Sequence, residues 1–349
     1  MTNKAGKKAA RISAVILAFT LIAVSGAAAY GEERELIPMG CTIGIQMQTD
    51  GIIVVGLSEV ETEEGMVSPA GEAGVMPGDV IKMLGNVELT SAAHFVEETG
   101  KLGEADATLT IERMGSVIQL RVRPRLAGDG IYKLGLWLRD SVAGIGTVTF
   151  LDPVSGLYGA LGHAISDIDT GILLPLATGS ILGSQVVDVR RGAVGVPGEL
   201  CGYFDREDTR GTIEKNTAQG IFGTMDVEDR YGQAVPIGHE DEIRIGPAKI
   251  LANVSGTEIR EFSIEITRIY KGAENTRNLT ITVTDPDLLA ITGGIVQGMS
   301  GSPIIQDGKL IGAVTHVLIN DPTSGYGISI DNMLRSAQAD DGRATLRAA

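Results

Sequence analysis

Aromatic residues, cysteines and histidines are all scarce in this chain of 349 residues. Aromatic side chains make up 4% of the chain, whereas glycine is abundant, with 47 residues, and runs of Val, Ile and Thr recur. This combination favours short strands joined by many turns, and therefore a mostly β chain. Two cysteines, Cys41 and Cys201, are too few for a disulfide scaffold, although a single bridge between them stays open.

Positive charge is also in short supply. The chain has 29 Lys and Arg against 44 Asp and Glu, and its formal net charge is -15. Such an acidic body argues against nucleic acid and against an anionic membrane surface as partners. Because the sequence has no phosphate-binding loop and no residues at a convincing metal-ligand spacing, we expect no cofactor and no metal.

One segment lacks charge altogether. Residues 12–30 carry no charged side chain, and the residues before them include four basic residues and no acidic one. This pattern predicts a signal peptide or membrane anchor in residues 1–30, with the Lys-rich end in the cytoplasm and the rest of the chain outside. Whether the segment is cleaved stays open.

Residues 40–124 carry the signals of a small binding domain. The stretch SPAGEAGVMPGDVI (68–81) predicts a short helix, a Pro-Gly turn and a buried strand. Ser91 suits the N-cap of a following helix, and residues 107–122 read as a hairpin. This order resembles a PDZ domain of bacterial envelope proteases, which binds an extended peptide as an added strand. By that resemblance the peptide carboxylate meets the N–H groups of Thr42, Ile43, Gly44 and Ile45; an empty spacer is the alternative.

A glycine-rich turn near the C-terminal end, GMSGSP (298–303), suits a nucleophilic serine. Gly298 and Gly301 allow positive φ angles, which turn peptide N–H groups inward. The N–H groups of Gly298 and Ser300 are therefore the candidates for an oxyanion hole. A strand, an Asp-Gly turn and a second strand follow in residues 304–314. The pattern resembles the nucleophile loop of chymotrypsin-like serine proteases, and a plain turn between two strands is the alternative.

The four histidines offer one good candidate for the general base. His163 stands in GHAISD, directly after an apolar run, and its place before Ser300 in the chain fits a chymotrypsin-like order. His94 is expected at the surface, and His239 sits in an acidic turn. His316 follows a buried-looking strand, a position that suits the wall of a substrate groove.

The third member of a triad is less clear from the residues alone. Asp285 follows an alternating run and precedes a proline, which predicts a carboxylate at a strand end. The usual chymotrypsin-like spacing instead favours an acid nearer the midpoint between histidine and serine. The alternatives to Asp285 are Asp167, Asp188, Asp226 and Asp241.

The motifs LGHAISD and VTDPDLLAITGGIVQGMSGSP, together with the N-terminal segment and the PDZ-like region, are similar to the SpoIVB peptidase family of spore-forming bacteria. The resemblance implies a catalytic triad of His163, Asp285 and Ser300. It also implies a mostly β fold in which the PDZ domain is followed, in residues 125–349, by a chymotrypsin-like double β-barrel. Residues 321–327 then either line the specificity pocket or cap a barrel.

The same resemblance implies a signalling serine endopeptidase of sporulation. Such an enzyme is secreted from the forespore into the space between the two membranes and cleaves a membrane-anchored regulatory protein. That cleavage releases an intramembrane protease that processes pro-sigma-K, and family members also cleave themselves near the N-terminus. The alternative is a non-catalytic envelope scaffold that binds a partner through its PDZ module and carries a degenerate protease barrel.

Overall fold

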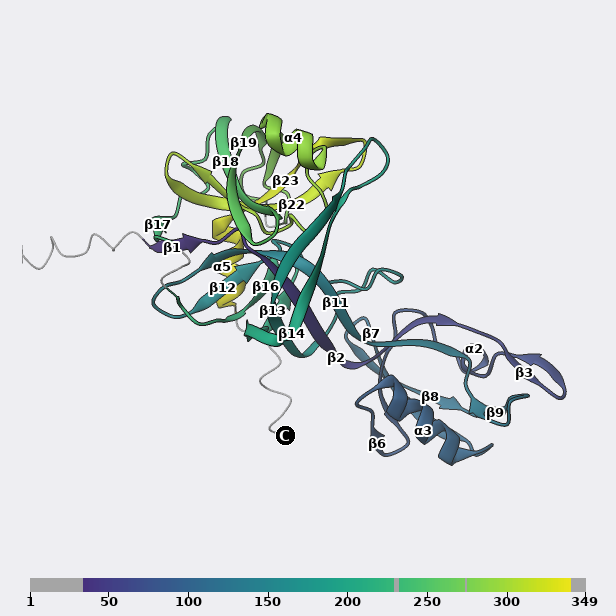
Figure 1. The fold of residues 1–349 in the computed structure, drawn as a ribbon. Helices are drawn as coiled ribbons and strands as arrows, with labels where there is room; N and C mark the ends of the chain where they lie inside the picture. Colours follow the sequence, from purple (N-terminus) through teal and green to yellow (C-terminus); the bar gives the residue numbers. More distant parts are fainter. Residues whose placement is uncertain (1–33, 229–231, 274, 340–349) are drawn as a thin grey trace, which may run out of the picture. The chain divides into compact units, whose positions relative to one another are not determined.

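The structure is a computed structural model that describes residues 34–228, 232–273 and 275–339. These residues form a mostly β molecule with two barrels and a PDZ-like part (Figure 1). The predicted signal peptide or anchor in residues 1–30 lies outside the described residues. Within the described ranges, no helix combines the length and the hydropathy needed to span a membrane. Within the described residues, no disulfide joins Cys41 to Cys201.

The first barrel is a long sheet that curls until its ends meet. Its strands follow the order β14, β13, β2, β11, β12, β16, and β14 returns to β16 through a bridge between Gly211 and Met225. Register shifts along β13 and β14 mark bulges, which bend strands and help a sheet to close. The strands are β2 (Thr42–Leu57), β11 (Leu136–Leu151), β12 (Leu157–Ala160), β13 (Leu176–Arg190), β14 (Glu199–Thr212) and β16 (Gly220–Thr224), with β1 (Glu35–Pro38), β15 (Lys215–Thr217) and β17 (Val235–Pro236) at the edges.

The second barrel closes in the order β18, β19, β20, β23, β22, β21. Buried Phe262, Ile264 and Ile266 alternate along β19 with outward-facing residues, so one face of the strand fills the barrel core. The predicted hairpin of residues 304–314 is confirmed as β21 and β22. The elements are β18 (Gly246–Ser255), β19 (Glu258–Ile269), β20 (Leu279–Val283), α4 (Pro286–Thr292), β21 (Pro303–Gln306), β22 (Lys309–Leu318), β23 (Asp321–Ser329) and α5 (Ile330–Gln338).

The PDZ-like part packs α3 against strands around a core that includes Phe95, Leu109 and Leu134. Two local predictions are confirmed: Ser91 caps α3 through a hydrogen bond from the His94 N–H group, and residues 107–122 form a hairpin. The elements are β3 (Val60–Thr62), β4 (Gly65–Val67), α2 (Pro69–Glu72), β5 (Val80–Leu84), β6 (Val87–Glu88), α3 (Ala92–Leu102), β7 (Ala107–Arg113), β8 (Ser116–Val122), β9 (Arg125–Leu126) and β10 (Tyr132–Lys133).

Two long strands, β2 and β11, belong to both the first barrel and the PDZ-like part. Residues 42–49 of β2 pair with β11 and β13 inside the barrel, whereas residues 52–57 pair with β5 and with the first residues of β11. The predicted division into residues 40–124 and 125–349 is therefore wrong for these strands. The PDZ-like part is inserted between two strands of the first barrel, so the barrel needs residues from both sides of it. The predicted fold class, a PDZ domain with a chymotrypsin-like double β-barrel, is confirmed.

Candidate active site

Two glycines with positive φ angles, Gly298 and Gly301, set the backbone conformation of the loop that carries Ser300. The φ angles are +96° at Gly298 and +99° at Gly301. A Cβ atom at Gly301 would lie 2.0 Å from the Thr147 carbonyl oxygen, so no other residue fits there without a backbone shift. Met299, between the glycine and the serine, is buried and anchors the loop in the core of the second barrel.

The loop also presents the two peptide N–H groups that the sequence predicts for an oxyanion hole. The N–H groups of Met299, Gly301 and Ser302 all donate to backbone carbonyls. Those of Gly298 and Ser300 donate to no acceptor within the described ranges. Each such donor aimed at a developing oxyanion contributes about 3 kcal/mol to the transition state. The N–H groups of Gly298 and Ser300 therefore stay the predicted pair for an oxyanion hole.

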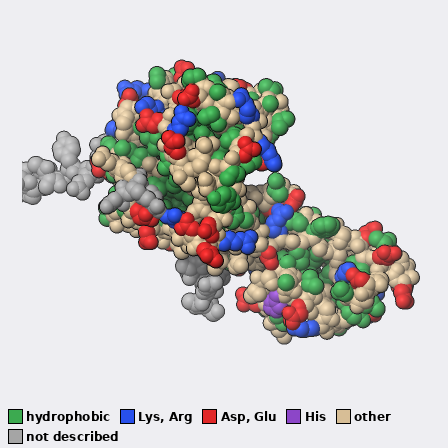
Figure 2. All heavy atoms as spheres, in the orientation of Figure 1, with side chains coloured by type: hydrophobic (Ala, Val, Ile, Leu, Met, Phe, Trp, Pro, Cys, Tyr) green, Lys and Arg blue, Asp and Glu red, His purple; other side chains and the backbone are tan. Residues whose placement is uncertain are grey.

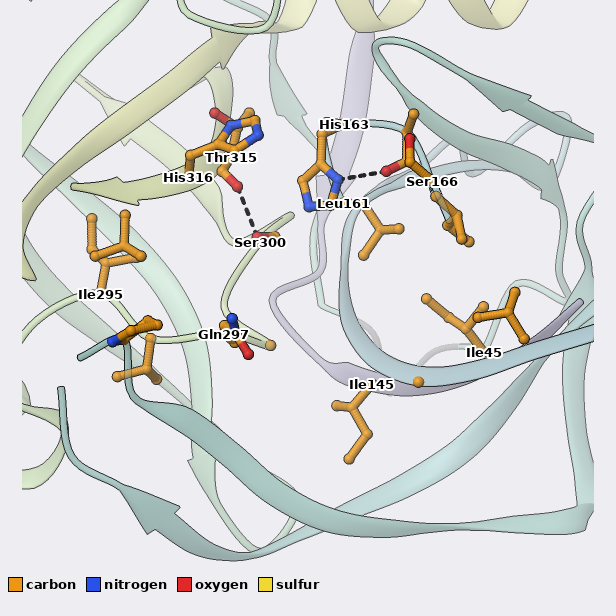
Figure 3. Close-up of a pocket in the computed structure, with 18 of the residues that line it drawn as sticks. Ile45, Ile145, Leu161, His163, Ser166, Ile295, Gln297, Ser300, Thr315 and His316 are labelled. Atoms are coloured by element: carbon orange, nitrogen blue, oxygen red, sulfur yellow. Dashed lines mark hydrogen bonds between the residues drawn. The ribbon is translucent and has the colours of Figure 1, made fainter. Parts of the chain in front are cut away.

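His163 lies in the same pocket as Ser300, on the loop that follows β12 (Figure 3). Its Nδ1 atom is 2.8 Å from the Ala164 carbonyl oxygen. A carbonyl can only accept, so Nδ1 carries the proton and Nε2 keeps its lone pair, as a general base requires. Burial lowers the pKa of His163, and the hydrogen bond to Ala164 opposes this only in part. The imidazole is therefore neutral at pH 7.

His316 is a second imidazole in this pocket. Its ring centroid lies 5.2 Å from that of His163, with the planes tilted by 42°. Burial, together with the nearby His163 and Arg277, lowers the pKa of His316 to about 4, so this ring is also neutral at pH 7. The hydroxyl of Ser300 donates to the carbonyl of Thr315, 2.8 Å away. His316 thus lines the pocket beside the nucleophile, which agrees with its predicted position in a groove wall (Figure 3).

Asp285 does not hold His163 in this structure. It is the N-cap of α4, and its carboxylate accepts hydrogen bonds from the N–H groups of Asp287, Leu288 and Ser263. Burial raises the pKa of this carboxyl group, but the three hydrogen bonds and the positive charge of Arg260 together outweigh that effect and leave the pKa below its usual value. The strand-end position was predicted correctly. The predicted contact with the histidine is replaced by the Ala164 carbonyl.

The alternative acids do not take that place either. Asp167 is buried and forms an ion pair with Arg139 on β11. Asp188 lies on β13 and accepts from the N–H group of Val189. Within the described ranges, no carboxylate forms a hydrogen bond with the ring of His163. The residues that the structure brings together are thus Ser300, His163 and His316.

Thr147 of β11 is a site residue that the sequence did not indicate. Its N–H group donates to the Ser300 carbonyl, at 3.1 Å, and its hydroxyl donates to the Gly298 carbonyl, at 2.7 Å. The side chain is 1% exposed. A strand of the first barrel therefore fixes the nucleophile loop of the second barrel, and only the fold could reveal this contact, since about 150 residues separate the partners.

The predicted peptide-binding residues Thr42, Ile43, Gly44 and Ile45 form no loop. They lie in β2, between β11 on one side and β13 on the other. Thr42 is buried and donates to the side-chain oxygen of Asn253. Because strands pair with both edges of Ile43, Gly44 and Ile45, a peptide cannot add to this part of β2 as a strand, and the prediction of a peptide-binding loop at residues 42–45 is wrong.

The PDZ-like part does keep a free edge elsewhere. Residues 136–139 of β11 pair with β2 on one side, and within the described ranges no strand pairs with their other edge. Helix α3 packs next to this segment and β10. Leu134, Gly135 and Leu136, at the start of this segment, have the same apolar-Gly-apolar order as residues 43–45. Gly135 has a φ of +74°, and a Cβ there would lie 2.2 Å from the Ser58 carbonyl oxygen.

Solved structures give weak global similarity. The HtrA-type protease AlgW with a decapeptide is 14% identical over 58% of this chain and 53% of its own, with a TM-score of 0.34. The Rv3671c protease from M. tuberculosis is 14% identical over 57% of this chain and 76% of its own, with a TM-score of 0.31. The PDZ domain of the SdrC-like protein from Listeria monocytogenes is 16% identical over 26% of this chain and 87% of its own, with a TM-score of 0.21. None of the curated proteins compared with the chain matches it.

The sequence profile of one family decides the assignment. The profile described as SpoIVB peptidase S55 matches residues 130–334. The matched span holds the histidine, the aspartate and the serine of the predicted triad. It also includes β11 with Thr147, which forms hydrogen bonds to the nucleophile loop. Because this span covers more than half of the 349 residues, the chain is a serine peptidase of the SpoIVB peptidase S55 family.

Proposed function

We propose that this protein is an exported endopeptidase whose acyl-transfer chemistry rests on Ser300 and His163. The observation that carries the proposal is the pocket in which both side chains lie beside two loop N–H groups that have no acceptor among the described residues. In the proposed reaction the Ser300 hydroxyl turns from the Thr315 carbonyl to Nε2 of His163. The serine oxygen attacks the scissile carbonyl carbon, and the histidine takes the proton.

The later steps need no further group. The N–H groups of Gly298 and Ser300 stabilise the oxyanion, and the protonated His163 returns its proton to the leaving amine. Water then releases the acyl group with the same histidine as base. The Ala164 carbonyl performs the orienting task of the third triad member, because it holds the proton on Nδ1.

We assign Asp285 the role of a positioning residue. The helix that it caps, α4, ends at Thr292, and the chain continues through Gly293 to Ile295 and Val296 in the pocket wall. Thr292 is buried, and its hydroxyl donates to the carbonyls of Leu288 and Gly294. Loss of the cap at the N-terminus of α4 would therefore shift the residues that lead into the nucleophile loop.

A fluorophosphonate probe tests the proposal on the full chain. Wild-type protein should be labelled covalently, and Ser300→Ala should lose all labelling because the nucleophilic oxygen is gone. His163→Ala should lower the labelling rate by orders of magnitude. An unlabelled but folded wild-type protein would instead favour the scaffold alternative, in which the barrel has no catalytic role.

The cellular role proposed is the signalling step of sporulation. The family assignment supports cleavage of a membrane-anchored regulatory protein that controls an intramembrane protease, as well as self-cleavage near the N-terminus. The uncharged stretch in residues 12–30 supports export, with the body of the protein in the space between forespore and mother cell. Size comparison of wild type and Ser300→Ala in sporulating cells tests this, since only the variant should accumulate the full-length chain.

A second, supporting function is proposed for the free edge of β11. An extended peptide added along residues 136–139, beside α3, would gain main-chain hydrogen bonds of about 1 kcal/mol each. Such docking would raise the local concentration of a substrate near the pocket.

A further inference from the structure

We propose that the peptidase selects an aliphatic, uncharged stretch of its protein substrate around the scissile bond. This inference rests on the proposed function and adds the chemical class of the substrate. Its basis is the composition of the pocket at Ser300, a cavity of about 490 Å³. Of the side chains that line this cavity, none belongs to Asp, Glu, Lys or Arg.

The pocket wall consists mainly of branched aliphatic side chains from both barrels. The first barrel supplies Ile45, Val142 and Ile145, and the second supplies Ile295 and Val317. In Figure 3, Ile45, Ile145 and Ile295 surround the space next to Ser300. Aliphatic contacts of this kind favour an apolar substrate side chain, because binding removes its methylene groups from water.

The apolar surface continues outside the cavity. Ile319 lines the pocket and is 56% exposed. The turn formed by residues 193–196 is fixed to it, because the Gly195 N–H group donates to the Ile319 carbonyl at 2.8 Å. Val194 and Val196, on either side of that glycine, are 75% and 61% exposed. Ile319 therefore extends the apolar lining to the surface, and the turn with the exposed Val194 and Val196 is attached to it.

Figure 2 shows acidic and basic side chains distributed over this face of the molecule, with hydrophobic side chains between them. The cavity at Ser300 differs from that face in having no charged side chain in its lining. A charged substrate residue would lose its hydration in such a cavity without finding a partner of opposite charge.

Glycine at position 144 gives a sharp way to alter the pocket. Gly144 lines the cavity, and a Cβ atom added there meets no atom within 4 Å. Gly144→Val should therefore fold and partly fill the cavity. Gly128→Val is the matched control, since a Cβ there also meets nothing within 4 Å and the residue lies outside the pocket.

The experiment is a cleavage profile of the full chain on a pooled peptide library, read by mass spectrometry. We expect Val, Ile or Leu to be enriched at least tenfold over Asp, Glu, Lys and Arg at a position next to the cleaved bond. Gly144→Val should shift that position towards Ala and smaller residues, and Gly128→Val should leave the profile unchanged. Preference for a charged residue, or a profile that Gly144→Val does not move, would overturn the proposal.

A charge at Ile319, an exposed residue of the pocket lining, gives an independent test. Ile319→Asp should lower cleavage of the aliphatic substrates at least tenfold and raise the share of peptides with Lys or Arg. Val154→Asp, at a side chain that is 94% exposed and outside the pocket, is its control. Labelling by the fluorophosphonate probe separates the two hypotheses. A labelled enzyme without aliphatic preference refutes the specificity alone, whereas an unlabelled wild type refutes the peptidase mechanism as well.

Discussion

Two segments of this chain share the pattern apolar-Gly-apolar and have different surroundings. Ile43, Gly44 and Ile45 lie in the middle of the first barrel, with β11 and β13 paired to either edge. Leu134, Gly135 and Leu136 lead into a strand whose outer edge no other strand pairs within the described ranges. At both glycines an added Cβ atom would collide with a neighbour, the Phe204 side chain at Gly44 and the Ser58 carbonyl oxygen at Gly135. Whether the neighbouring edge can bind a peptide depends on strands that are distant in sequence.

The largest effect in this comparison is expected from Gly44→Val. A Cβ atom at Gly44 would lie 2.3 Å from the Cβ atom of Phe204 on β14. We expect a loss of about 3 kcal/mol in the free energy of unfolding and a drop of more than a hundredfold in probe labelling of Ser300. Chemical denaturation and labelling measure this, with Gly128→Val as control. Normal labelling together with lost peptide binding would restore residues 42–45 as the peptide site.

Gly135→Val should have an intermediate and more selective effect. The residue has a positive φ, and its Cβ would meet the Ser58 carbonyl, so the turn before residues 136–139 must move. We expect binding of carboxyl-terminal decapeptides from a pooled library to weaken at least tenfold, while probe labelling stays within twofold of wild type. Equal loss of both readouts in a folded variant would mean that the turn supports the active site itself.

The smallest effect is expected from substitutions of Asp285, which distinguish its role as the cap of α4 from a role as the triad acid. Asp285→Ala should lower the free energy of unfolding by about 1 kcal/mol, and Asp285→Asn by less, because an asparagine oxygen can still accept the N–H bonds at the start of α4. For the same reason Asp285→Asn should keep kcat/KM within about tenfold of wild type. If that variant instead loses about 10⁴-fold in activity with unchanged melting, Asp285 acts as the triad acid in the reacting state.

The parts of the site that could be predicted from the sequence are those encoded locally. The turn around Ser300, its two N–H donors, the hairpin that follows and the cap at Ser91 all depend on residues a few positions apart. His163 could be predicted as the general base because it follows an apolar strand in the sequence. The orienting partner of His163 was not, because a backbone carbonyl leaves no signature in a sequence.

Other features depend on pairings that no local pattern specifies. The hydrogen bond from the Thr147 hydroxyl to the Gly298 carbonyl joins a strand of one barrel to a loop of the other. The division of β2 between barrel and PDZ-like part is invisible in the sequence, where residues 42–57 read as two separate apolar segments around Asp50 and Gly51. Both depend on which strands meet after folding.

The insertion of the PDZ-like part between two barrel strands has a consequence for genetic dissection. A deletion of residues 40–124, chosen to remove a targeting module, would also remove the strand that pairs with β11 and β13. The deletion would inactivate the protease by disrupting its first barrel. That loss of activity would be mistaken for proof that targeting is essential. A deletion that retains residues 34–50 and rejoins the chain near residue 141, where the barrel pairing of β11 begins, would ask the intended question.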